Sequence, residues 1–371
     1  MIDGAKIRSA RAARGWSQSD LMAAMRTQAV RNGWTLMRPD SLRGAVSRWE
    51  NDRHAPDHHY SRLLRAVMPE LDRNERLVGE PNVAASVSAA TEDSLHSVLA
   101  AHVDSCRALD RRFGAPAARK QTTAHVESLD MLWRNTFGAD KRTVAYAHAE
   151  AASLAAWQDL DVGDLVSASN HYAAAKLAAA RAEDPVRLAH TMGEEAIMLA
   201  ETGRVRQAVD QVEVATAAQQ LPTLLRSWLW ATRAQIHAGA NSDARAARRA
   251  LTRAEKLLAT TKTAEAPELP FLSHNPVHFA RWSGHVLALL SDSAAGPVTR
   301  DALSQLPSDF VRARAAQHLD LAQDALNGQR HAEAAGILSA SAESIDGLGS
   351  VRLRRRHRLL SGRVRSPAET V

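Results

Sequence analysis

The stretch SLRGAVSRWENDRHAP, residues 41–56, combines an apolar stripe with arginine side chains that lie off it. Its apolar residues recur at helical spacing, at Leu42, Val46 and Trp49. Off that stripe, the guanidinium groups of Arg43 and Arg48 can each donate two parallel hydrogen bonds to a planar acceptor. Gly44 lies off it as well, although glycine costs roughly 1 kcal/mol against alanine inside a helix. The pattern predicts a short helix that packs one face on a core and presents its arginines to a partner.

Helices on both sides must hold this stretch in place, and the sequence predicts them over the first 76 residues. The expected elements are a helix over residues 4–14 ended by Gly15, a helix from Gln18 towards Asn32, a loop over 32–40, the helix of the stretch above, capped by Asp40 or Ser41, and a last helix over 58–68. Ser17 is expected to cap the second helix, with Asp20 completing a capping box. This arrangement predicts a helix-turn-helix with two flanking helices.

Two motifs in this region resemble those of the Cro/repressor-type (XRE) helix-turn-helix family. They are WSQSDL, residues 16–21, and AVSRWENDRHAP, residues 45–56. The family patterns are Ser/Thr-Gln-x-x-Leu and Ile/Val-Ser-x-Trp/hydrophobic-Glu-Asn/Arg-Gly-x-x-x-Pro. The chain departs from them twice, because the segment between the motif helices is about ten residues longer than usual, and because Asp52 stands where the family usually has glycine.

The resemblance implies that the chain binds double-stranded DNA, with the second motif helix in the major groove. Arg43 and Arg48 would then reach base edges, where each guanidinium can bond guanine O6 and N7, and Gly44 would let the backbone approach the groove closely. Gln18 would touch a phosphate. The complete DNA-facing set is Gln18, Ser41, Arg43, Gly44, Ala45, Ser47 and Arg48. The alternatives are a merely solvated basic face for the arginines and simple drift for the glycine.

The resemblance also implies a structural ion pair, and the small number of base pairs that one such domain reads implies a homodimer. Glu50 is similar to a family carboxylate that pairs with an arginine of the first helix, here Arg11. One small helix-turn-helix reads too few base pairs to find a site in a genome, so two copies on an inverted repeat are expected.

His54 and His58 are four residues apart, but Pro56 between them breaks helical geometry, so no metal site is expected.

Composition indicates an all-helical protein of two or three domains. The chain has 371 residues, of which 45% are hydrophobic and only 4% aromatic. The single cysteine, Cys106, excludes an internal disulfide and suits a reducing cytoplasm. No apolar run reaches the ~18 residues of a membrane span, and the start MIDGAKIRSARAARG lacks the apolar segment of a signal peptide. We therefore expect a cytoplasmic protein with no membrane contact.

Charge is distributed unevenly along the chain. Residues 1–76 hold 14 basic against 9 acidic side chains, net +5, and residues 350–371 hold seven arginines and one glutamate, net +6. The formal total is +6, so residues 77–349 sum to −5. This asymmetry predicts that only part of the chain meets a polyanion. For the last helix, SVRLRRRHRLLSGRVRS, the interpretations are a capping helix with a polar outer face or an additional phosphate contact.

Beyond a predicted linker over residues 77–94, residues 95–371 show helical patterns and a repeat. Small residues and one larger apolar residue recur in four units: Ala156, Ala168, Tyr172 and Ala175; Ala196, Ala208, Val212 and Ala215; Ala247, Leu251 and Ala254; Ala322, Ala334, Leu338 and Ser341. A further degenerate unit is expected around residues 282–306. Small residues let the two helices of a hairpin approach closely, and stacked hairpins share a core. The pattern is similar to tetratricopeptide repeats, so we expect an α-solenoid for dimerisation or ligand sensing.

The least regular piece of the repeat region, residues 267–285, combines aromatic and amide side chains in a proline-bounded stretch. The candidate ligand residues are Phe271, His274, Asn275, His278 and Trp282. The alternative is a packed loop between repeats. Trp157, Trp228 and Trp230 are expected in the core. The net negative charge suits a cationic or amphipathic signalling peptide, and a small molecule is the other option.

Enzyme motifs are not found in the sequence. It contains no GxxxxGK[ST], HExxH, GxSxG or CxxC, and Glu194 and Glu195 are adjacent on one helix, so they point about 100° apart. We therefore expect a transcriptional regulator that is not an enzyme and needs no cofactor. The alternative is a helical-repeat scaffold that binds a protein or peptide, with DNA contact secondary.

Overall fold

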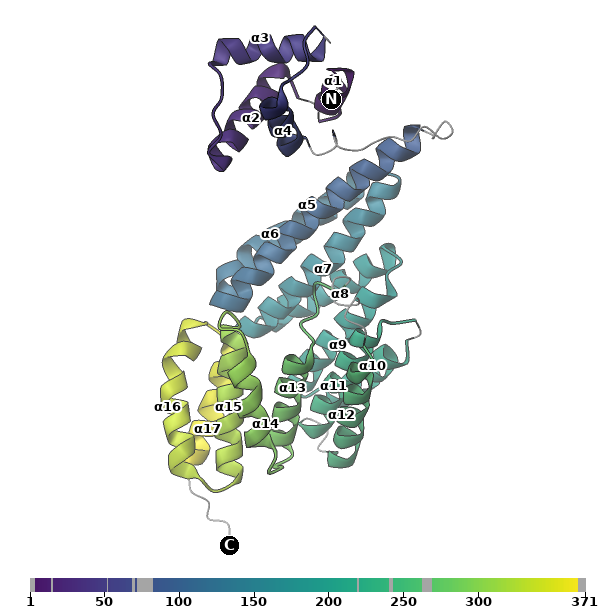
Figure 1. Cartoon of the computed structure of the whole chain (residues 1–371). Helices are drawn as coiled ribbons and strands as arrows, with labels where there is room; N and C mark the ends of the chain where they lie inside the picture. Colours follow the sequence, from purple (N-terminus) through teal and green to yellow (C-terminus); the bar gives the residue numbers. More distant parts are fainter. Residues whose placement is uncertain are drawn as a thin grey trace. The chain divides into compact units, whose positions relative to one another are not determined.

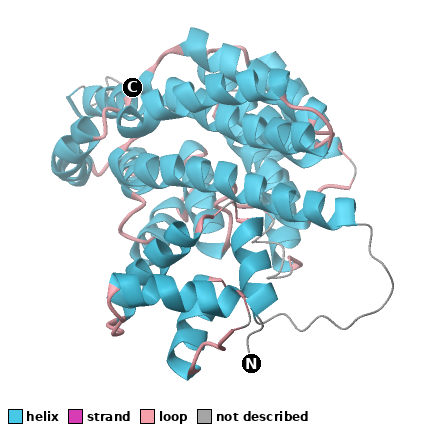
Figure 2. Ribbon diagram, turned by 90° about the horizontal axis from the view of Figure 1, so that it is seen from above, coloured by secondary structure: helices cyan, strands magenta, loops and turns pink. Residues whose placement is uncertain are grey.

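The computed structural model describes residues 4–14, 16–51, 53–68, 71, 83–218, 220–239, 243–261 and 269–365, and for 83–94 and 139 the backbone only. Every regular element in these ranges is a helix (Figure 2). The chain divides into two compact units, Met1–Asn82 and Val83–Val371. None of the described helices is both long and apolar enough to span a bilayer. The residues Gly15 and Asp52, which the sequence analysis singled out, lie outside the described ranges.

The first unit is a small helical bundle (Figure 1). Its helices are α1 (Gly4–Ala13), α2 (Gln18–Asn32), α3 (Pro39–Glu50) and α4 (His58–Val67). The core takes apolar side chains from all four, among them Ile7, Leu21, Met25, Leu42, Val46, Leu63 and Leu64, each fully buried. The expected stripe of α3 is therefore its core face. The loop before α3 packs on the same core through Trp34, Leu36 and Met37.

The start of α2 follows its local sequence. Ser17 is the N-cap, and its hydroxyl accepts a hydrogen bond from the backbone N–H of Asp20, whose carboxylate accepts one from the backbone N–H of Ser17. The predicted capping box is confirmed. Gly33 ends the helix in the left-handed region at φ 66°, where glycine carries no Cβ penalty.

The expected start of α3 is wrong. We predicted Asp40 or Ser41 as the cap, but the helix begins earlier, at Pro39, with Arg38 as N-cap and no side-chain capping bond. Proline favours the first helical position because its missing N–H would have no partner there. Asp40 and Ser41 consequently lie inside the first turn.

The second unit is a continuous succession of helices. They are α5 (Val83–Phe113), α6 (Ala115–Asn135), α7 (Ala139–Val162), α8 (Leu165–Arg181), α9 (Pro185–Glu201), α10 (Val205–Ala217), α11 (Thr223–Ala238), α12 (Ala244–Ala259), α13 (Pro276–Leu289), α14 (Ala295–Gln305), α15 (Val311–Asn327), α16 (His331–Gly347) and α17 (Val351–Arg365). Helix α5 begins at Val83, so residues 83–94, two thirds of the segment expected as a linker (77–94), are helical. Residues 77–82 lie outside the described ranges.

Consecutive helices pack in pairs, which is consistent with a helical-repeat arrangement. The hairpins are α7–α8, α9–α10, α11–α12, α13–α14 and α15–α16. The small residues of the expected repeat sit inside them: Ala156, Ala168, Ala175, Ala196, Ala208, Ala247, Ala254, Ala322 and Ala334 are fully buried. In the degenerate unit around residues 282–306, the close approach of α13 to α14 lies at Gly284. A Cβ on Gly284 would lie 2.3 Å from Thr299 Oγ1.

The two ends of this unit meet. Helix α5 contacts α15, and α17 contacts α7. Two glycines with positive φ permit the approach: a Cβ on Gly114 would lie 2.3 Å from the carbonyl oxygen of Leu348, and one on Gly349 would lie 2.7 Å from Pro116 Cγ. The first helix of each hairpin, together with α17, therefore faces a common interior.

Candidate functional site

The outward face of α3 carries most of the side chains that the sequence analysis assigned to DNA. Ser41, Arg43 and Arg48 are exposed, and Gly44 and Ser47 are half-buried. Ala45 is an exception, because it lies in the core at 5% exposure and cannot be reached by a partner. Its inclusion in the DNA-facing set is wrong, since the buried face of α3 is wider than the stripe of Leu42, Val46 and Trp49.

Glu50, at the end of α3, joins three helices through its carboxylate. Its Oε1 accepts a hydrogen bond from Arg11 Nε at 2.5 Å, and its Oε2 accepts one from Arg11 Nη2 at 3.1 Å. The amide of Gln18 donates to the same Oε2 at 2.7 Å. Arg8 donates to the backbone carbonyl of Glu50. Arg11 and Glu50, the ion pair expected from the sequence, are thus in contact. Gln18, which was expected at a phosphate, instead donates a hydrogen bond to Glu50.

The charge of Glu50 is held in place by these partners. Burial alone would raise the pKa of this carboxyl group, which is 2% exposed. Hydrogen bonds from Arg11 and Gln18 and the charges of Arg11 and Arg8 outweigh burial, so the pKa lies below its ordinary value. The ionised carboxylate therefore fixes α1 and α2 against α3.

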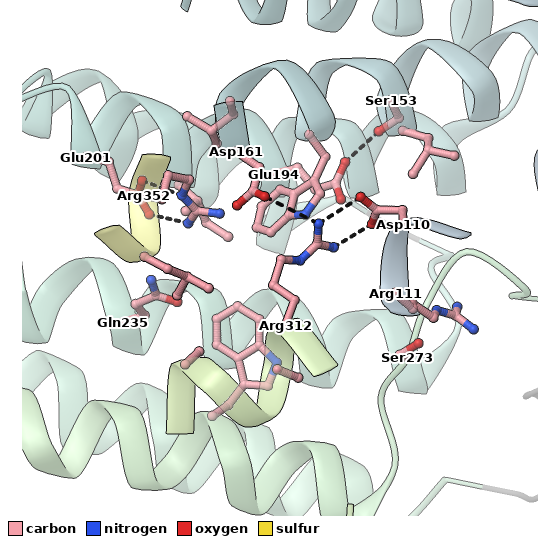
Figure 3. A pocket seen from close by; sticks show the side chains of 18 of the residues that line it. Asp110, Arg111, Ser153, Asp161, Glu194, Glu201, Gln235, Ser273, Arg312 and Arg352 are labelled. Carbon is pink, nitrogen blue, oxygen red and sulfur yellow. Dashed lines mark hydrogen bonds and ion pairs between the residues drawn. The ribbon is translucent and has the colours of Figure 1, made fainter. Parts of the chain in front are cut away.

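The second unit contains a partly open cavity of about 740 Å³ (Figure 3). Its walls come from α5, α7, α9, α11, α13, α15 and α17 and from the loop over residues 269–275. Five aromatic side chains supply apolar surface: Trp157, Trp228, Phe271, Trp282 and Phe310. The volume falls within the range of about 300–1,000 Å³ that small-molecule sites occupy.

Ion pairs between distant parts of the chain hold this interior together. Arg312 on α15 donates two hydrogen bonds to Asp110 on α5, at 2.8 and 2.6 Å (Figure 3). Arg352 on α17 is bound by Glu201 on α9. Ser350 donates to Asp161 at 2.7 Å. These contacts join the last helices to the first ones, so they close the ring of inner helices.

Two carboxyl groups of the cavity, Glu150 and Glu194, have their pKa raised by burial. Burial raises the pKa of Glu194 to about 7, against a hydrogen bond from Ser153 at 2.6 Å and more distant arginines that lower it. Burial lowers the pKa of its neighbour His190 to about 3, so this ring is neutral near pH 7 and offers no cation. Glu195 bonds Lys176 and Gln211 on the outer side. The adjacent glutamates therefore belong to different surroundings, as their helical geometry predicts.

The candidate ligand residues of the sequence analysis divide into two groups. Phe271, His278 and Trp282 line the cavity. His274 does not, because it is buried with its Nε2 2.9 Å from the hydroxyl of Ser227. Asn275 does not either, because its side chain caps α13 by accepting from the backbone N–H of His278. Assigning these two residues to a ligand is therefore corrected to a packing role and a capping role.

Sequence reasoning missed several residues of the cavity. Trp157 and Trp228 pack in the core as expected, and both also line the cavity. The arginines of α5 and α15 were assigned to no site, and those of α17 were interpreted as a polar outer face or an additional phosphate contact. One signal was present, since tryptophans lie on the first helix of three of the five hairpins, in α7, α11 and α13. Such a recurrence marks the inner face of a solenoid, which is commonly its binding face.

The comparisons with known proteins identify no family for the chain: no family model, curated protein or solved structure matches it. Within the described residues, no cluster of three or more His, Cys, Asp or Glu side chains could hold a metal ion. The two candidate sites are therefore the outer face of α3 and the cavity.

Proposed function

We propose that the protein is a sequence-specific DNA-binding regulator of transcription that acts as a homodimer on an inverted repeat. The observation that carries the proposal is the outer face of α3. Arg43 and Arg48 are exposed there, and neither has a carboxylate partner among the described residues. Two free guanidinium groups on one rigid helix match the donor pattern that reads guanine in the major groove.

The support of α3 strengthens this proposal. Its inner face is buried, and Glu50 ties its end to α1 and α2 through Arg11 and Gln18. A reading helix must be held rigidly, because its side chains have to reach base edges within hydrogen-bond distance. The same arrangement fits the resemblance of the sequence to the XRE helix-turn-helix family. The long segment between the motif helices is taken up by α2 and by a loop that packs on the core.

We further infer that the second unit is a tetratricopeptide-like domain that senses a ligand. The cavity supports a sensor, because a helical unit that served only to join two copies would not need one. A ligand can change DNA affinity only by the difference between its binding free energies for two arrangements of the unit. Such a difference is typically ~1–3 kcal/mol.

A helical-repeat scaffold for a protein partner is the second candidate. It is favoured by large apolar side chains exposed on α5 and α6, since Val98, Met131 and Leu132 are 65%, 64% and 45% exposed. A second copy of the chain would cover them equally well, and the regulator proposal places it there.

The test is DNA selection with the full-length protein. Repeated selection from random duplexes should enrich an inverted repeat. On that site Arg43→Ala and Arg48→Ala should each cost about 1–3 kcal/mol, while binding to random duplexes should change little. Arg62→Ala is the control, because it removes the same charge from α4, where Arg62 stacks on Trp34 at 4.5 Å. If selection enriches no sequence, the regulator proposal fails. Equal losses on specific and random DNA would instead make both arginines phosphate contacts.

A further inference from the structure

The cavity carries more positive than negative side chains, although the unit around it is acidic. Eight arginines and six carboxylates line it. Five of the arginines bind carboxylates of the wall: Arg107, Arg187, Arg312, Arg352 and Arg356. For Arg111, Arg281 and Arg355, the described part of the chain supplies no such partner. An anionic ligand therefore fits this interior better than the cationic peptide that the net charge suggested.

Arg281 is the least compensated of these cations. Burial lowers the pKa of Arg281 to about 10; the charge of Asp320 raises it and that of Arg312 lowers it, but neither effect is as large as that of burial. Asp320 itself is occupied, because its Oδ1 accepts hydrogen bonds from His285 and Arg356, both at 2.6 Å. The side chain of Arg281 is half-buried, and its Nε is buried with no hydrogen-bond partner among the described residues. An unpartnered buried donor beside a positive charge is costly, so an anion from outside the chain would supply what is missing.

Three polar side chains that line the cavity lie on one turn of α13. His278, Arg281 and Trp282 are spaced i, i+3 and i+4, which places them on one face of the helix. The buried atoms His278 Nδ1, Arg281 Nε and Trp282 Nε1 have no hydrogen-bond partner among the described residues. Arginine and indole nitrogens only donate, so the missing partner must be an acceptor.

The remaining surface is apolar and aromatic. Trp228 meets Trp282 edge to face, with ring centroids 6.4 Å apart, and Phe271 continues this surface beside His190. Flat aromatic walls favour a planar apolar body. A site with donors at one turn of α13 and aromatic rings beside it distinguishes the two ends of a ligand.

We propose that this cavity binds a small organic acid, with its oxyanion on Arg281 and Trp282 of α13 and its planar apolar body against Trp228 and Phe271. This inference deepens the ligand-sensing part of the proposed function and rests on it, but it needs no DNA. If the oxyanion displaces no existing ion pair, binding adds hydrogen bonds to donors that otherwise have none.

The test uses a pair of fluorescent probes with the same body and different charge. Anilinonaphthalene sulfonate carries an oxyanion, and N-phenylnaphthylamine is its uncharged counterpart. The full-length protein should bind one equivalent of the sulfonate, excited through the cavity tryptophans by energy transfer, and bind it more tightly than the amine. Arg281→Met should weaken sulfonate binding about 10- to 100-fold, as expected for loss of a charged hydrogen bond, and leave amine binding within about twofold.

Matched variants distinguish binding in the cavity from non-specific binding of the probes. Arg249→Met removes an exposed arginine of α12 that does not line the cavity, and should change neither probe. Arg281→Lys should retain part of the preference for the sulfonate, and Trp282→Phe should lose part of it. If Arg281→Met fails to fold, these two variants still test the assignment. Without ligand, Arg281→Met should also raise the melting temperature, since it removes a half-buried charge that lacks an anion.

The inference is overturned if the two probes bind equally well, if the native chain takes up no stoichiometric sulfonate, or if the Arg281 and Trp282 variants leave the ratio of the two affinities unchanged. DNA selection reports on the other part of the proposal. Enrichment of an inverted repeat together with any of these probe results would remove the organic acid and keep the regulator.

Discussion

Replacing Glu50 with glutamine should destabilise the first unit far more than the loss of one surface charge would. The carboxylate accepts three hydrogen bonds, two from Arg11 and one from Gln18, and it is 2% exposed. Glutamine keeps the shape but turns one acceptor into an N–H donor that faces other donors. Arg11, 17% exposed, would then be left without its anion. Removing one partner of a buried pair costs about 3–5 kcal/mol. Because water can reach part of Arg11, we expect roughly 3 kcal/mol.

Hydrogen exchange followed by mass spectrometry on the full-length protein can localise this effect. Core amides of α2 and α3 should exchange about a hundredfold faster in Glu50→Gln, because each 1.4 kcal/mol is a factor of about ten. Asp40→Asn is the matched control, since Asp40 is exposed on the same helix, and it should cost no more than about 1 kcal/mol. Equal protection in the two variants would refute the argument that Glu50 holds the three helices together.

The dependence on pH gives a second check. The folded-state pKa of Glu50 lies below its ordinary value of 4.5, so its stabilisation is complete above that value and is lost as the pH falls through the folded-state pKa. The difference in urea stability between the wild type and Glu50→Gln should therefore be full at about pH 7 and much smaller at about pH 3. A difference that grows towards acid would contradict the assignment of an ionised carboxylate.

Two further substitutions address DNA binding and assembly. Gly44→Ala should stabilise α3 by up to about 1 kcal/mol, since the added Cβ would meet only the flexible end of Arg48, at 3.2 Å. The same methyl group should weaken specific DNA binding. Unchanged affinity in a binding titration would show that the backbone does not approach the groove at this residue. Met131→Glu replaces an apolar side chain of α6, 64% exposed, with a charged one. If a second copy covers this surface, sedimentation should show dissociation of the dimer. A dimer that persists at the same protein concentration as the wild type would place the interface elsewhere.

The sequence by itself determined the elements whose signals are local. The capping box of Ser17 and Asp20, the apolar stripe of α3 and the extent of α2 could be predicted because helix ends and faces depend on residues three or four positions apart. The recurring small residues predicted the hairpins for the same reason, since their spacing fixes where two adjacent helices approach.

Only the tertiary structure decided which distant side chains meet. Arg312 reaches Asp110 across 202 residues of sequence, and Ser350 reaches Asp161 across 189. No local pattern encodes such contacts, because the small rotation between successive hairpins accumulates along the unit and determines whether its ends meet. Closure places arginines of α5, α15 and α17 on the wall of one cavity, and it brings the core residues Trp157 and Trp228 to the same lining.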